Sequence, residues 1–138
     1  MSEDWFSWYC RQVDKDKKWP TFRDRYLCPC CYMPTLGERM GYEICTVCFW
    51  EDDGQDSDDA DDIRGGPNGN YSLSEARRNF EKHFTMYRPE DRQAFDRETR
   101  KTNMKAEIYR AYTEAMKSNK ETDWQAALEM EQKDEEHS

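Results

Sequence analysis

The chain has 138 residues, the size of one domain or of one domain with an appendage. Hydrophobic residues make up 36% of it and charged residues 37%, so its 5 Trp, 8 Tyr and 6 Phe are expected to supply much of the core. No apolar run approaches the roughly 18 residues of a membrane-spanning helix. The first residues also lack the basic and apolar regions of a secretory signal, so we predict a soluble, cytoplasmic protein that does not contact membranes.

Residues 1–25 are predicted to form an aromatic N-terminal helix followed by a connector. Within residues 3–13, four side chains follow helical spacing and share one face: Trp5, Trp8, Tyr9 and Val13. We interpret this face as part of the core; a surface that contacts a partner is the alternative. Pro20 restricts the residue before it and ends any helix.

Four of the six cysteines form two C-x-x-C pairs, Cys28 with Cys31 and Cys45 with Cys48. A C-x-x-C turn directs two sulfurs toward one point, and two such turns complete the four-sulfur tetrahedron of structural zinc. We therefore predict a zinc site with these four cysteines as ligands; a redox pair and disulfides are the alternatives. A reducing cytosol favours zinc-bound thiolates over structural disulfides.

Two further cysteines are not assigned to the metal. Cys30 lies in the middle of the first pair, where the side chain of such a turn normally points away from the metal. We interpret it as a buried or half-exposed thiol, and an exchange with one of the ligands is the alternative. Cys10 lies in the aromatic N-terminal stretch, where packing as a small hydrophobic side chain is the default.

The segment between the two pairs is predicted to form a β-hairpin bracketed by Gly37 and Gly41. The β-branched and aromatic residues typical of short strands follow: Tyr42, Ile44, Phe49 and Trp50. We expect these side chains to shield the metal on its apolar side. Stacking against a ligand is the alternative.

The net charge of −9 is concentrated in residues 51–62, which hold eight acidic side chains and no basic one. Because the rest of the chain is close to neutral, no basic surface for nucleic acid is expected. Helix–loop–helix calcium sites place glycine at the sixth loop position and glutamate at the twelfth, a pattern that this segment lacks. We interpret the segment as a solvated acidic loop; a cation site and docking onto a basic partner surface are the alternatives.

A glycine-rich turn and a capped helix follow the acidic loop. Residues 65–69 (GGPNG) lack the Lys and Ser/Thr of a phosphate-binding loop, so they are predicted to form a turn. Ser72 with Glu75 is a capping box that opens a helix. One face of this helix is apolar and consists of Leu73, Ala76, Phe80 and Phe84. His83 lies beside this face and is interpreted as a polar or core histidine, not as a ligand.

Residues 89–138 are predicted to form a C-terminal helical extension. Pro89 is typical of a first helical turn. A second helix ends near Asn119, and Thr122 with Gln125 forms another capping box. The apolar stripe of the second helix consists of Ile108, Tyr109, Ala111, Tyr112, Ala115 and Met116.

Four segments in this order resemble the bacterial cysteine-rich CPCC family: 27–31 (LCPCC), 41–56 (GYEICTVCFWEDDGQD), 65–69 (GGPNG) and 72–80 (SLSEARRNF). The resemblance covers about residues 26–84. Tyr32 stands where glycine often follows the first pair in this family, and Thr46 stands where proline is common. Neither is a ligand, so these departures bear on loop shape and not on metal binding. The resemblance implies a zinc-ribbon-like module, found in small bacterial proteins and often encoded near toxin genes.

Together these observations predict an α+β protein: a small zinc-ribbon-like β-hairpin module packed with several α-helices. Residues 26–88 would form this module, with its acidic loop and capped helix. Four thiolates close a zinc site and the chain has only 2 His, so we do not expect an enzyme. We expect a zinc-stabilised interaction module, and the resemblance points to an immunity protein that blocks a cognate bacterial toxin. The alternatives are a zinc-ribbon accessory of nucleic acid or translation machinery, and a thiol redox protein.

Overall fold

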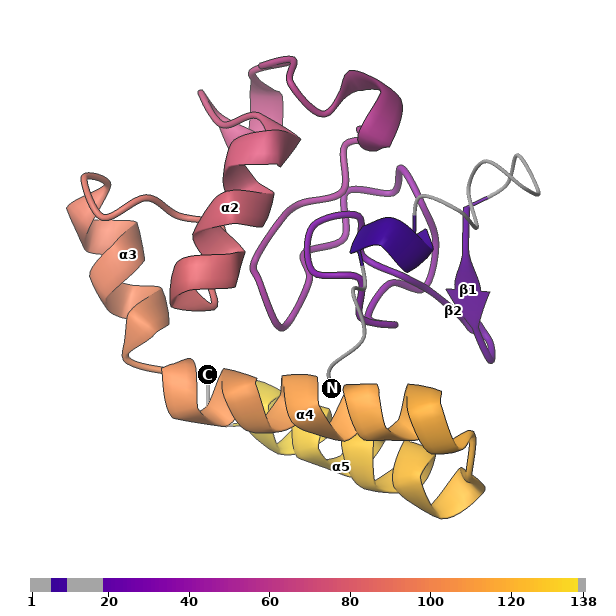
Figure 1. The fold of residues 1–138 in the computed structure, drawn as a ribbon. Helices are drawn as coiled ribbons and strands as arrows, with labels where there is room; N and C mark the ends of the chain where they lie inside the picture. Colours follow the sequence, from indigo (N-terminus) through magenta and orange to yellow (C-terminus); the bar gives the residue numbers. More distant parts are fainter. Residues whose placement is uncertain (1–5, 10–18, 137–138) are drawn as a thin grey trace.

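A computed structural model describes residues 6–9 and 19–136, with backbone alone for residues 134–136 (Figure 1). Residues 6–9 are helical, and two 3-10 turns cover Ser57–Asp59 and Gly66–Asn68. The prediction of an α+β fold is confirmed. The named strands and helices are β1 (Thr21–Phe22), β2 (Arg25–Tyr26), α2 (Leu73–His83), α3 (Arg92–Thr99), α4 (Thr102–Ser118) and α5 (Glu121–Glu136).

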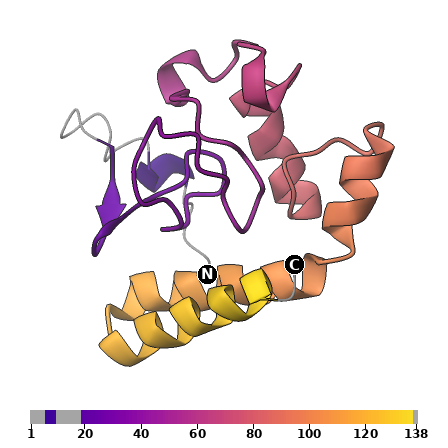
Figure 2. The same cartoon turned by 180° about the vertical axis from the view of Figure 1, so that it is seen from behind.

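The cysteine-bearing loops lie between α2 on one side and the antiparallel pair α4 and α5 on another (Figures 1 and 2). The amide of Met86 donates to the carbonyl of Cys48 at 2.9 Å, which fixes the chain after α2 to these loops. Between α4 and α5, Tyr112 packs against Trp124 with ring centres 5.7 Å apart. None of the helices that the structure describes is long and apolar enough to cross a membrane.

The predicted hairpin between the two cysteine pairs is wrong in position. The regular hairpin is β1–β2, which precedes the first pair and pairs Thr21 with Tyr26. Farther along, single bridges join Tyr26 to Leu36 and Ile44 to Glu51, so that each cysteine pair forms the tip of its own short loop. The physical reason is that the C-x-x-C turns themselves reverse the chain. The shielding role is also wrong for Tyr42 and Ile44, which are exposed, whereas Trp50 is fully buried.

The helix boundaries follow the sequence signals in part. α3 begins at Arg92, so the prediction of Pro89 in a first helical turn is wrong. Ser72 caps α2 by accepting from the amide of Glu75, which is half of the predicted capping box; the carboxylate of Glu75 accepts from Arg88 instead of completing it. The predicted stripe on the second C-terminal helix is confirmed in α4, where Ile108, Tyr112 and Ala115 are buried. The predicted capping box at Thr122 is wrong, because α5 already begins at Glu121.

The aromatic N-terminal stretch contributes to the core where the structure describes it. Tyr9 is fully buried, and its ring packs against Tyr32 with centres 5.1 Å apart. Trp8 is half-buried beside it. Trp5 and Val13, which were predicted on the same face, lie outside the described residues.

The acidic segment 51–62 is not the solvated loop that its composition predicts. Asp52 and Asp56 are buried, and both accept hydrogen bonds from the guanidinium of Arg39, at 2.9 and 3.0 Å. The hydroxyl of Tyr9 also donates to Asp56, at 2.6 Å. Two carboxylates therefore sit inside the fold because an arginine from outside the segment neutralises them. The exposed acidic side chains of this segment are Asp58, Asp61 and Asp62.

A second buried ion pair joins α3 to α4. Lys105 of α4 donates to Glu98, and both side chains are almost completely buried. Arg97 donates to the other carboxylate oxygen of Glu98 at 2.8 Å. Burial raises the pKa of Glu98, but the hydrogen bonds from Lys105 and Arg97 outweigh this effect and hold the pKa below its usual value.

Replacing Lys105 by Met should lower the free energy of unfolding by about 3 kcal/mol, because it leaves a buried carboxylate with less compensation. The stabilising contribution of Glu98 is present above its unfolded-state pKa and is lost as pH falls through its folded-state pKa. In Lys105→Met the folded-state pKa of Glu98 rises, so the variant should lose less stability than the wild type as pH falls. Urea unfolding at a series of pH values measures both effects.

The exposed Lys117 on the same helix supplies the control. Lys117→Met should change the free energy of unfolding by no more than about 0.5 kcal/mol. Equal effects of the two substitutions would contradict a stabilising role for the pair of Lys105 and Glu98.

Candidate metal centre

The two C-x-x-C pairs fold into two turns with the same backbone pattern. In the first turn, the amide of Tyr32 donates to the carbonyl of Cys28 at 2.8 Å. In the second, the amide of Phe49 donates to the carbonyl of Cys45 at 3.0 Å. Tyr32 and Phe49 both have left-handed backbone conformations, with φ of 69° and 75°. The turn thus keeps its shape with Tyr32 at the position where the family resemblance leads one to expect glycine.

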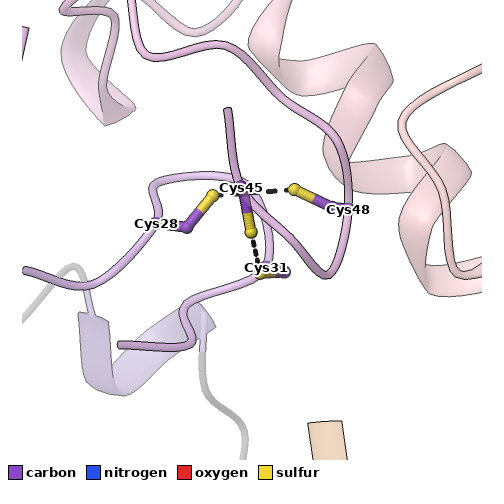
Figure 3. Close-up of side chains that lie close together, drawn as sticks. All are labelled: Cys28, Cys31, Cys45 and Cys48. Atoms are coloured by element: carbon purple, nitrogen blue, oxygen red, sulfur yellow. Dashed lines mark hydrogen bonds between the residues drawn. The ribbon is translucent and has the colours of Figure 1, made fainter. Parts of the chain in front are cut away.

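The turns bring four sulfurs into one small volume (Figure 3). The Sγ atoms of Cys28 and Cys48 lie 3.6 Å apart, as do those of Cys31 and Cys45. All four Sγ atoms lie within 4.8 Å of one another, and all four residues are buried. Four sulfurs held about 2.3 Å from a tetrahedral metal lie about 3.8 Å apart. The observed spacing fits a bound metal and is far longer than the roughly 2.05 Å bond of a disulfide.

Donors around the sulfurs favour the thiolate form. The amides of Cys30 and Val47 point at the Sγ atoms of Cys28 and Cys45, each at 3.4 Å. The hydroxyl of Thr35 donates to Cys45 Sγ at 3.1 Å. Such donors orient metal-bound thiolates and offset part of their negative charge. Thr35 belongs to neither pair, and the sequence patterns did not single it out.

Four buried thiols cannot all ionise without a cation. Burial raises the pKa of Cys28, Cys31 and Cys48. At Cys45 burial acts in the same direction, but hydrogen bonds from the other three thiols and from Thr35 outweigh it and lower the pKa. A divalent metal ion would stabilise all four as thiolates.

The remaining cysteines and the histidine are placed differently. Cys30 is buried with a raised pKa, caused first by burial, and it lies outside the four-sulfur group. Cys10 lies outside the described residues. His83 packs edge-on against Phe95, with ring centres 5.1 Å apart, and is not part of the group.

The alternative of a cation site in the acidic segment 51–62 gains no support. In the described part of the chain, the group of His, Cys, Asp and Glu side chains close enough to hold a metal is the four cysteines. Arg64 lies over the segment instead, donating to the carbonyl of Asp53 and to the carboxylate of Asp59.

A buried carboxylate connects the second turn to the C-terminal helix. Glu131 of α5 accepts from Thr46, the residue that follows Cys45, at 2.5 Å. It also accepts from Tyr112 at 2.7 Å and from Arg25 at 2.8 Å. The role of Glu131 was missed from the sequence, because it depends on contacts with distant residues. Thr46 was noted there only as a departure from the family pattern.

Comparison with known proteins gives one match. The sequence model of a family described as cysteine-rich CPCC matches residues 26–101, which is more than half of the chain. The matched region contains both cysteine pairs, the acidic segment, α2 and α3. No curated protein and no solved structure matches the chain.

Replacing Glu131 by Ala should lower the free energy of unfolding by about 2–4 kcal/mol, because the hydroxyls of Thr46 and Tyr112 lose a charged acceptor inside the fold. Hydrogen exchange should also rise in the second cysteine turn and in α5. Urea unfolding and amide exchange measure the two effects. Glu129 is exposed on the same helix, and Glu129→Ala should change stability by no more than about 0.5 kcal/mol. A stability loss of the same size in Glu129→Ala would argue against a stabilising role for the contacts of Glu131 with Thr46, Tyr112 and Arg25.

Proposed function

The chain belongs to the cysteine-rich CPCC family, and we propose that it is a non-enzymatic protein-interaction module stabilised by one zinc ion. The ligands in this proposal are Cys28, Cys31, Cys45 and Cys48. The observation that carries it is the tetrahedral spacing of four buried sulfurs, which are free thiols in the structure.

Zinc is the metal that best suits this set of donors. Soft thiolates favour zinc over magnesium or calcium, and four sulfurs in tetrahedral positions are typical of structural zinc sites. A catalytic zinc keeps one position open for water or substrate, whereas four protein ligands fill the coordination sphere. The donor set therefore supports a structural role for the metal.

The zinc proposal predicts one zinc ion per chain in native mass spectrometry. Cys45→Ser should lose this zinc and unfold the cysteine-bearing loops, because structural zinc contributes roughly 10–16 kcal/mol to small metal-dependent folds. Cys30→Ala should keep the zinc and lose only about 1 kcal/mol of stability, since Cys30 lies outside the four-sulfur group. A Cys45→Ser protein with full zinc content and unchanged thermal unfolding would refute the proposal.

An interaction role is supported by apolar side chains at the surface next to the metal centre. Met40, Tyr42 and Ile44 are 53%, 58% and 46% exposed on the segment that leads into the second cysteine turn. We call these three residues the apolar strip. Contiguous exposed apolar surface is typical of sites that bind another protein, and these three side chains add exposed apolar area on one short segment. The metal would hold this segment rigid, which lowers the entropic cost of binding.

The partner we propose is a cognate bacterial toxin, because the family resemblance associates such proteins with neighbouring toxin genes. Bacteria that express the toxin encoded beside this gene should survive when the chain is co-expressed. The double substitution Tyr42→Ala and Ile44→Ala should weaken this protection and the binding of the two purified proteins by about tenfold or more. Ile63 is 62% exposed outside the apolar strip, and Ile63→Ala should preserve both. Absence of binding and of protection in the wild type would reject the immunity role while leaving the zinc site standing.

A further inference from the structure

A cavity of about 540 Å³ lies beside the first cysteine turn. Its lining includes Phe80 and two arginines from α2, Phe84 at the end of that helix, and Tyr109 from α4. Cys30 and Cys31 line it from the side of the metal centre. This volume falls within the range of sites that bind small organic molecules. Neither the structural role of the zinc nor the proposed partner surface assigns a function to this cavity.

Aromatic rings form much of the wall. The ring centre of Phe84 lies 5.2 Å from that of Phe80 and 5.6 Å from that of Tyr109. Phe84 has a left-handed backbone with φ of 58°, which costs a bulky residue about 1 kcal/mol. These ring contacts offset that cost and hold an apolar surface at the cavity, against which a flat hydrophobic group can pack.

Outside the metal centre, the charged side chains of the lining are two arginines and one glutamate, in a chain whose net charge is −9. They are Arg77, Arg78 and Glu81. The guanidinium of Arg77 is held in place by two hydrogen bonds: it donates to the carbonyl of Pro29 at 2.8 Å and to the hydroxyl of Ser57 at 3.1 Å. It also pairs with the carboxylate of Asp56 at 3.8 Å, which accepts a hydrogen bond from Arg39 as well.

Arg78 is the cation that is left for a ligand. It is exposed and makes no hydrogen bond or ion pair with any residue that the structure describes. A guanidinium next to an apolar wall can donate two parallel hydrogen bonds to a carboxylate while the rest of the ligand packs on the rings.

We propose that this cavity binds a small aromatic carboxylate, with its ring against Phe80, Phe84 and Tyr109 and its carboxylate at Arg78. Because Arg77 is already paired with Asp56, Arg78 is the one guanidinium available, and a single guanidinium matches one carboxylate better than a doubly charged phosphate ester. The site is separate from the proposed partner surface and extends the function beyond it.

The test uses the whole zinc-loaded chain and three probes with the same ring system: naphthoate, the neutral naphthalenemethanol, and naphthyl phosphate. Amide NMR titrations report binding at the backbone of α2 and near Tyr109. Naphthoate should bind saturably and shift these resonances. Naphthalenemethanol should bind roughly fivefold more weakly, since it lacks the ion pair with Arg78.

Arg78→Ala should weaken naphthoate binding by the same factor, about fivefold, and should leave the affinity for naphthalenemethanol unchanged. The control is Arg92→Ala, because Arg92 is an exposed arginine at the start of α3 outside the cavity, and it should bind naphthoate like the wild type. The proposal is overturned if naphthoate does not bind, if the neutral probe binds equally well, or if both arginine variants lose the same affinity. Tighter binding of naphthyl phosphate than of naphthoate would overturn the assignment to carboxylates.

Discussion

Four cysteine sulfurs crowded into one buried volume are the constraint on which the rest of the structure depends. The chain around them offers little regular sheet: within the described residues, single bridges at Tyr26 and Leu36 and at Ile44 and Glu51 flank the two turns. Backbone pairing of this extent is too small to hold such loops in place. A metal ion shared by the two turns would supply the missing cross-link, as it does in small domains with thin cores.

Buried charge supports the loops where hydrophobic residues are scarce. Arg39 neutralises Asp52 and Asp56 beneath the acidic segment, and Arg25 does the same for Glu131 beside the second cysteine turn. In each case a charged group from one segment is compensated by a group distant in sequence. Such pairs add little net stability compared with apolar packing, but breaking one leaves an uncompensated charge. They therefore fix which loops lie next to each other.

Features that depend on local patterns could be predicted from the sequence, and features that depend on distant partners could not. The spacing of the cysteine pairs, the cap at Ser72 and the stripe on α4 each rest on residues a few positions apart. The burial of Asp52 was missed because its partner, Arg39, lies outside the acidic segment. The role of Glu131 was missed for the same reason. Composition alone predicts that an acidic segment is solvated. The fold places Arg39 beside Asp52, and this arginine makes its burial possible.

The aromatic residues that follow the two cysteine pairs show how the metal centre positions the surrounding helices. Tyr32 and Phe49 adopt left-handed conformations in which glycine would avoid a cost of about 1 kcal/mol. Contacts of their rings, which glycine cannot make, offset that cost. Tyr32 packs on Tyr9 of the N-terminal helical turn, and the ring of Phe49 lies under the charged groups of Arg97 and Lys105, at 5.4 and 5.6 Å. The strained turns thus carry the side chains that attach the N-terminal turn, α3 and α4, so a metal ion that fixes the turns also fixes the arrangement of these helices.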